Sequence, residues 1–154
     1  MEYFVQIMAA IFSAIGFSLL FNIHGRKMII TAVGGAITWG AYLIVFTQTD
    51  NVFLACFIAT MVIMAFAEIM ARIAKTPVII LLVPMLVPMV PGGDLYRMMI
   101  NLVMDDSDQV RFFGYKLVME VGAIAFGIIV ISTAMQLILK MHAHIKETRK
   151  VSKV

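Results

Sequence analysis

The sequence is poor in charge and in cysteine, and both shortages narrow the classes of protein that it can encode. Charged residues make up 14% of the chain and hydrophobic residues 62%, whereas roughly 25% of the residues in a soluble domain are charged. The single cysteine, Cys56, lies in an apolar stretch, so no disulfide framework or thiolate metal site can be built. The histidines lack ligand spacing, and we expect no metal, cofactor or nucleic-acid partner.

The apolar residues are gathered into stretches that carry no charge. These stretches cover residues 3–25, 28–49, 51–67, 76–93 and 121–139. A helix needs ~20 mostly apolar residues, and ~17 at least, to cross a hydrocarbon core of ~30 Å. The sequence therefore predicts an all-α integral membrane protein, a five-helix bundle with helices at about 3–23, 28–48, 52–72, 77–92 and 113–140. This transmembrane domain occupies residues 1–141, and residues 142–154 form a basic tail.

Basic residues are unevenly shared between the two ends of this bundle. If all five helices cross, one side receives Arg26, Lys27, Arg72, Lys75, Lys140, Lys146, Arg149, Lys150 and Lys153, and the other receives only Arg97, Arg111 and Lys116. Lys and Arg accumulate on the cytoplasmic side of membrane helices. We therefore expect the N-terminus outside and the C-terminus in the cytoplasm. A fourth helix that only dipped in and returned would move the basic tail outside, so five crossings are favoured.

Small residues recur at the spacing that lets membrane helices approach closely. The sets are Ala10, Ala14 and Ser18, then Ala32, Ala36 and Gly40, and finally Ala123 with Gly127. They predict helix packing and say nothing about substrate. Trp39 and the tyrosines at positions 42, 96 and 115 are typical of anchors at the membrane interface.

The fourth apolar stretch differs from the others because it contains all four prolines of the chain. Pro77, Pro84, Pro88 and Pro91 are spaced so that a continuous helix would stack them on one face. An interior proline removes an amide donor and displaces the carbonyl four residues earlier. The carbonyls of Ile80, Pro84 and Val87 are therefore expected to lose their helical partners. Such carbonyls must face protein or water, because leaving them free in hydrocarbon is costly.

The prolines are followed by Gly92-Gly93, where we expect the helix to break because glycine adopts backbone angles closed to other residues. Asp94 then suits the N-cap of an amphipathic helix at 94–104. Transporters place substrate at discontinuous helices of this kind. The alternative is a merely kinked structural helix, since proline is frequent in membrane helices. The candidate substrate or translocation residues are Pro84, Pro88, Pro91, Gly92, Gly93 and Tyr96.

Acidic residues near the predicted membrane boundaries offer weaker candidates. Glu68 and Arg72 lie four apart on one helix, and either a structural ion pair or a proton-coupling site fits them. Glu120, one turn after Lys116, is similarly ambiguous. The cluster of Asp105, Asp106 and Asp108 invites comparison with Mg²⁺-dependent membrane transferases, but ordinary turn formation explains it better.

The proline-rich segment resembles a known signature. The run Ala71-Arg72, Pro77, Pro84, Pro88, Pro91-Gly92 and Tyr96 is similar to that of the threonine/serine exporter family, and Asn22 and Arg26 after the first helix also fit. The chain resembles, over nearly its whole length, the small subunit that corresponds to the C-terminal membrane half of that family.

The resemblance implies a subunit of a secondary exporter for small amino acids, or for dicarboxylates such as succinate, in the bacterial cytoplasmic membrane. In the split form a larger membrane subunit supplies the other half, and assembly with further copies of the same chain stays open. We expect no enzymatic activity. Two other classes are kept for comparison: a structural or assembly subunit that does not contact substrate, and a membrane-embedded enzyme that uses the aspartate loop.

Overall fold

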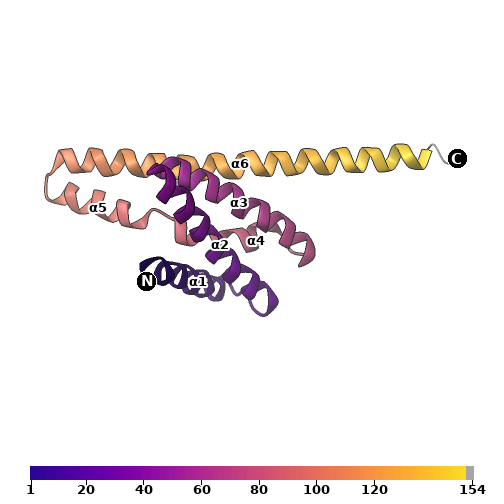
Figure 1. The fold of residues 1–154 in the computed structure, drawn as a ribbon, viewed down its shortest axis with the longest axis horizontal. Helices are drawn as coiled ribbons and strands as arrows, with labels where there is room; N and C mark the ends of the chain where they lie inside the picture. Colours follow the sequence, from indigo (N-terminus) through magenta and orange to yellow (C-terminus); the bar gives the residue numbers. More distant parts are fainter. Residues whose placement is uncertain (152–154) are drawn as a thin grey trace.

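The computed structural model describes the backbone of residues 1–151 and places almost all of it in helices. The side chains of residues 139 and 142–151, and the whole of 152–154, lie outside the described part, so the predicted basic tail is described only as backbone. Three helices come first: α1 (Glu2–Leu20), α2 (Arg26–Thr49) and α3 (Val52–Ile73). They run back and forth beside one another, and the long last helix packs against α3 (Figure 1).

Short polar residues mark the point where α2 ends and α3 begins. Asp50 adopts the left-handed region at φ 49° and ends α2, a conformation that the short polar side chains of Asp and Asn tolerate. The Asn51 side chain then accepts a hydrogen bond of 3.1 Å from the Leu54 amide and caps α3. The turn between α2 and α3 is therefore fixed by two adjacent polar residues.

The fourth apolar stretch forms a bent pair of helices. It comprises α4 (Val78–Leu86), the 3₁₀ turn η1 (Val87–Met89) and α5 (Gly92–Val103), with a bend of 54° between the two parts. In the described chain, α1, α2, α3 and residues 107–138 are long and apolar enough to cross a membrane, which makes four candidate spans. The bent pair makes a fifth span if it crosses as one. The predicted stacking of all prolines along one helical face is wrong, because regular α-helix ends at Leu86.

Pro91, rather than the two glycines, causes the break. A proline disfavours helical angles for the residue before it, and Val90 is extended at φ −62° and ψ 123°. Pro91 itself has φ −76° and ψ 54°, and the Gly92 amide donates to the Val90 carbonyl at 2.7 Å. This geometry is an inverse γ-turn. Gly92 and Gly93 lie inside α5, and Gly25 alone has positive φ among the glycines of residues 1–151, so the predicted glycine break is wrong.

The last helix, α6 (Ser107–Val151), is longer than the predicted 113–140. At 1.5 Å per residue its 45 residues span roughly 68 Å, about twice a hydrocarbon core. Its first turns form a hairpin with α5 that extends past the α2–α3 turn (Figure 1). The Asp106 carboxylate accepts a 3.2 Å hydrogen bond from the Gln109 amide and caps α6. Asp108 pairs with Arg111 at 2.8 Å. Two of the three aspartates therefore make local contacts at the start of α6.

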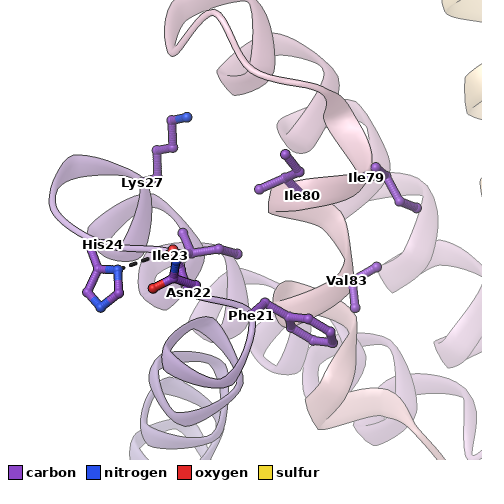
Figure 2. Close-up of a pocket in the computed structure, with 8 residues that line it drawn as sticks. All are labelled: Phe21, Asn22, Ile23, His24, Lys27, Ile79, Ile80 and Val83. Atoms are coloured by element: carbon purple, nitrogen blue, oxygen red, sulfur yellow. Dashed lines mark hydrogen bonds between the residues drawn. The ribbon is translucent and has the colours of Figure 1, made fainter.

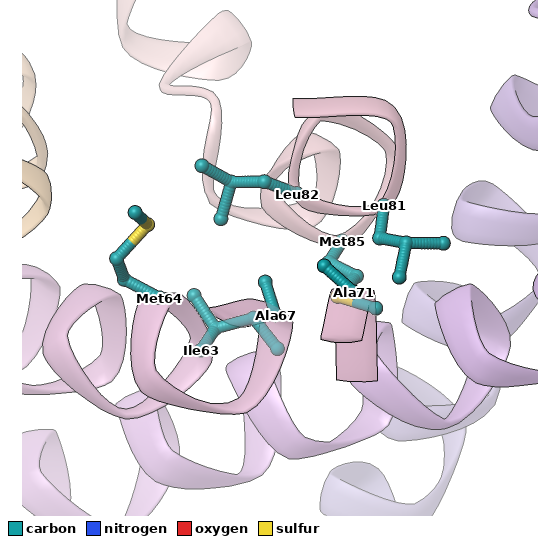
Figure 3. Packing of buried hydrophobic residues seen from close by; sticks show 7 residues of the cluster. All are labelled: Ile63, Met64, Ala67, Ala71, Leu81, Leu82 and Met85. Carbon is teal, nitrogen blue, oxygen red and sulfur yellow. The ribbon is translucent and has the colours of Figure 1, made fainter. Parts of the chain in front are cut away.

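The core lies where α4 packs on α3. Leu81, Leu82 and Met85 of α4 face Ile63 and Ala67 of α3, and all five side chains are buried (Figure 3). This contact fixes α4 at the centre of the bundle. The 3₁₀ turn that follows it is therefore held in place beside α1 and α2.

Small residues allow the other helices to approach closely. The predicted positions Ala10, Ala14 and Ser18 of α1 are buried, as are Ala123 and Gly127 of α6. On α2 the predicted face is wrong: the buried residues are Thr31, Gly34, Gly35 and Thr38, whereas Ala32, Ala36 and Gly40 are half-buried. A Cβ at Gly127 would lie 2.8 Å from the Thr60 Cβ, so α6 and α3 need glycine there.

Candidate functional site

A cavity of about 270 Å³ lies at the break between η1 and α5. It is lined by Trp39, Tyr42, Cys56, Pro88, Met89, Val90, Pro91, Gly93, Asp94, Arg97, Lys116 and Glu120. These residues come from α2, α3, the 3₁₀ turn η1 and the break after it, α5 and α6. Cys56 lies one turn into α3, ~6 Å along the helix axis from Val52. The break cavity, as we call it, therefore lies close to the end of the bundle where α2 turns into α3.

Charges of both signs meet in the break cavity. The Lys116 Nζ lies 2.8 Å from Asp94 Oδ2 and 3.9 Å from Glu120 Oε1. Glu120 is 7% exposed, and its Oε2 has no hydrogen-bond partner among the described residues. A buried carboxylate oxygen without a partner is costly. Two carboxylates thus share one ammonium, and one of their oxygens is left to accept a hydrogen bond.

Aromatic side chains and a second cation complete the wall. The Trp39 and Tyr42 rings stack with centroids 4.9 Å apart, and the Trp39 indole donates to the Gln6 side chain at 3.1 Å. The Arg97 guanidinium lies 5.7 Å from the centroid of the Phe113 ring, within cation–π range. The cavity therefore offers a rigid aromatic wall, two cations and two carboxylates to a small polar molecule.

The structure brings together some of the residues predicted for a substrate site and separates others. Pro88, Pro91 and Gly93 line the break cavity. Pro84 is instead fully buried within α4. Gly92 is exposed and is not among the lining residues, and Tyr96 is 66% exposed on the outer face of α5.

Two details of the predicted chemistry are wrong. The Val87 carbonyl is not free, because it accepts a 3.1 Å hydrogen bond from the Val90 amide in the 3₁₀ turn. Asp94 does not cap α5: Pro91 occupies the N-cap position, without a side-chain hydrogen bond, and Asp94 lies in the first turn. Its carboxylate still lies near the positive end of the helix dipole, but its partner is Lys116 from α6.

The Glu68–Arg72 pair lies away from the break cavity. Arg72 Nη2 contacts Glu68 Oε2 at 2.8 Å, and Arg72 Nη1 donates to the Glu68 backbone carbonyl at 2.6 Å. Glu68 is buried on α3 between the core residues Ala67 and Ala71. The geometry is that of a local ion pair within one helix, and neither residue lines the break cavity.

Asn22 and Arg26 lie at the opposite end of the bundle, in and after the turn between α1 and α2. Asn22 adopts φ 58° and lines a cavity of about 610 Å³ between this turn and α4 (Figure 2). Arg26 lines a separate cavity of about 650 Å³ against the end of α3. The two residues that the exporter resemblance singled out are therefore not part of the break cavity.

The residues that give the break cavity its chemistry were only partly predicted from the sequence. Glu120 and Lys116 were noted as an ambiguous pair four residues apart, but not as part of a substrate site. Nothing in the sequence links them to Asp94. Tyr42 was interpreted as an interface anchor and Cys56 only as an unpaired thiol, because their position on the cavity wall depends on how α2 and α3 pack.

The long apolar helices, with a bent pair and a charged cavity at the bend, define a multi-pass membrane protein. The sequence model of the family described as Threonine/Serine exporter, ThrE matches residues 6–134. The chain therefore belongs to the threonine/serine exporter family and is a membrane component of such an exporter. The family is one of transporters and not a class of enzyme. No curated protein and no solved structure matches the chain.

The family predicted from the proline-rich segment is thus confirmed. The split arrangement, with a larger partner subunit, stays a prediction.

Proposed function

We propose that this chain is one membrane half of a secondary exporter in the bacterial cytoplasmic membrane, and that its substrate binds in the break cavity. The observation that carries the proposal is the buried Glu120 carboxylate, whose Oε2 lacks a partner among the described residues while Lys116 is shared with Asp94. Ionisable groups inside a membrane protein are functional candidates by default, because burying them is costly. Broken membrane helices are where transporters bind substrate.

The charges of the cavity suit a small zwitterion. The ammonium of an amino acid can donate to Glu120 Oε2 and to the Asp94 carboxylate, and its carboxylate can accept from Lys116 or Arg97. A dicarboxylate would place a second negative charge beside two acids. Like charges disfavour such binding at short range. The cavity therefore favours threonine or serine over succinate as the substrate.

A partner subunit is favoured by the surface of α5. None of its residues is buried, although one face is apolar, with Leu95, Met99 and Leu102 at helical spacing and each at least 45% exposed. Asp94 and Arg97, on the same helix, line the break cavity. A larger subunit packed on α5 would therefore cover the apolar face and close one side of the site.

The test is threonine efflux from liposomes that contain the full chain and its partner. Lys116→Met and Glu120→Gln preserve approximate side-chain size while removing one charge each. We expect each to lower efflux by ~10–100-fold, because each removes one charge-assisted hydrogen bond to the substrate, which contributes about 1.5–3 kcal/mol. Asp108→Asn is the matched control, because that carboxylate is exposed in the first turn of α6 and does not line the cavity. Normal efflux by both cavity variants would favour the structural or assembly subunit instead.

A further inference from the structure

Two apolar cavities flank the first turn of α2 and share the same two residues on their walls. One, of about 610 Å³, lies against Ile79, Ile80 and Val83 of α4 (Figure 2). The other, of about 650 Å³, lies against Ile73 and neighbouring residues at the end of α3. Both have His24 and Lys27 on their walls.

The shared rim is basic and has no acidic partner. Lys27 is half-buried, and its Nζ donates to Thr76 Oγ1 at 3.3 Å, which holds the ammonium between α2 and the start of α4. The Arg26 guanidinium is exposed beside it, on the wall of the larger cavity. Neither Lys27 nor Arg26 forms an ion pair with any residue of the described chain.

Membrane topology explains why basic residues lie at this end of the bundle, but it does not explain the paired cavities. Ile73 and Ile79 are 67% and 61% exposed, and each lines a cavity that also has Lys27 on its wall. A ligand that occupies both cavities must carry a negative charge where they meet, at Lys27, and must branch into two apolar parts, one for each cavity. Free phosphate satisfies only the first condition, and a neutral two-chained lipid satisfies only the second.

We propose that this end of the bundle is a binding site for one anionic diacyl phospholipid, with its phosphate at Lys27, Arg26 and His24. One acyl chain lies along α4 in the smaller cavity and the other lies along the end of α3 in the larger. Basic pockets between membrane helices bind anionic headgroups in this way. Because residues of the α1–α2 turn and of α4 line the same cavity, a lipid bound there would bridge α4 to this turn.

The test is native mass spectrometry of the full chain after delipidation in detergent. The protein is titrated with phosphatidylglycerol or with phosphatidylcholine of the same acyl chains. We expect one phosphatidylglycerol to be retained at lower concentration than phosphatidylcholine. Lys27→Gln is expected to weaken retention by about fivefold. Arg111→Gln removes the same charge near the other end of the bundle and is the control that leaves retention unchanged.

A second variant separates the acyl chains from the headgroup. Val83→Trp fills the smaller cavity while keeping every charge, and we expect it to weaken phosphatidylglycerol retention as well. Equal retention of the two lipids, or no effect of Lys27→Gln, would overturn the proposal. Displacement of the lipid by glycerol phosphate would reduce the site to a phosphate site. Displacement by the partner subunit would instead make the cavities a subunit interface, and either result would overturn the proposal.

Discussion

The two acidic residues buried within apolar helices have different surroundings. Those surroundings distinguish a structural ion pair from a candidate transport residue. Glu68 has its partner on its own helix, one turn away, and is buried on α3. Glu120 shares Lys116 with another carboxylate and faces a cavity. The sequence could mark both acids as unusual within apolar helices. It could not tell them apart, because the difference arises from Asp94 of α5, which also pairs with Lys116.

Glu68→Gln is expected to lower stability and preserve transport. Glutamine keeps the size of the side chain, and Arg72 retains the Glu68 backbone carbonyl as a partner, but the charge attraction is lost. A partly exposed ion pair contributes up to about 1 kcal/mol, which lowers the thermal midpoint by ~2–4 °C for a chain of this size. The measurement is thermal unfolding of the exporter complex together with threonine efflux. Loss of efflux from a folded complex would make Glu68 a coupling group.

At the scale of the element, proline decides the path of the chain. A break of the fourth helix was predicted at Gly92-Gly93, and the structure has a bend of 54° just before these residues, between Met89 and Gly92. The cause was assigned to the wrong residues, since Gly92 and Gly93 are ordinary helical positions. A glycine in a sequence does not show which backbone angles it adopts. A proline does restrict the residue before it, so the extended backbone of Val90 could have been predicted from Pro91. The packed faces of α1 and α6 followed from small-residue spacing, but that of α2 did not, because several of its faces carry small residues.

Pro91→Ala is expected to abolish most efflux, while Gly92→Ala is tolerated. Alanine at position 91 frees Val90 to become helical, so η1 and α5 straighten and the break cavity loses its wall. A Cβ at Gly92 meets no described atom within 4 Å, which makes this neighbour a matched control. Threonine efflux normalised to the amount of assembled complex measures both. Equal efflux from the two variants would show that the bend is not required.

At the scale of the whole molecule, the basic residues predict the orientation in the membrane. On a Cys56-free background, a cysteine at position 50 should react with an impermeant reagent from outside the cell, and one at position 150 only after the membrane is opened. This result follows if the bent pair α4–α5 crosses as one span. Labelling of position 150 from outside would mean that the pair returns to its own side and that four helices cross.

The most direct test of a substrate site at the break uses the natural cysteine. Cys56 is the sole cysteine of the chain and is buried on the wall of the break cavity. In the assembled exporter, threonine in this cavity should slow the reaction of Cys56 with a small methanethiosulfonate reagent. The protection should rise with threonine concentration, saturate over the range that saturates efflux, and vanish in Glu120→Gln. A reaction rate that saturating threonine leaves unchanged in a transporting complex would place the substrate elsewhere.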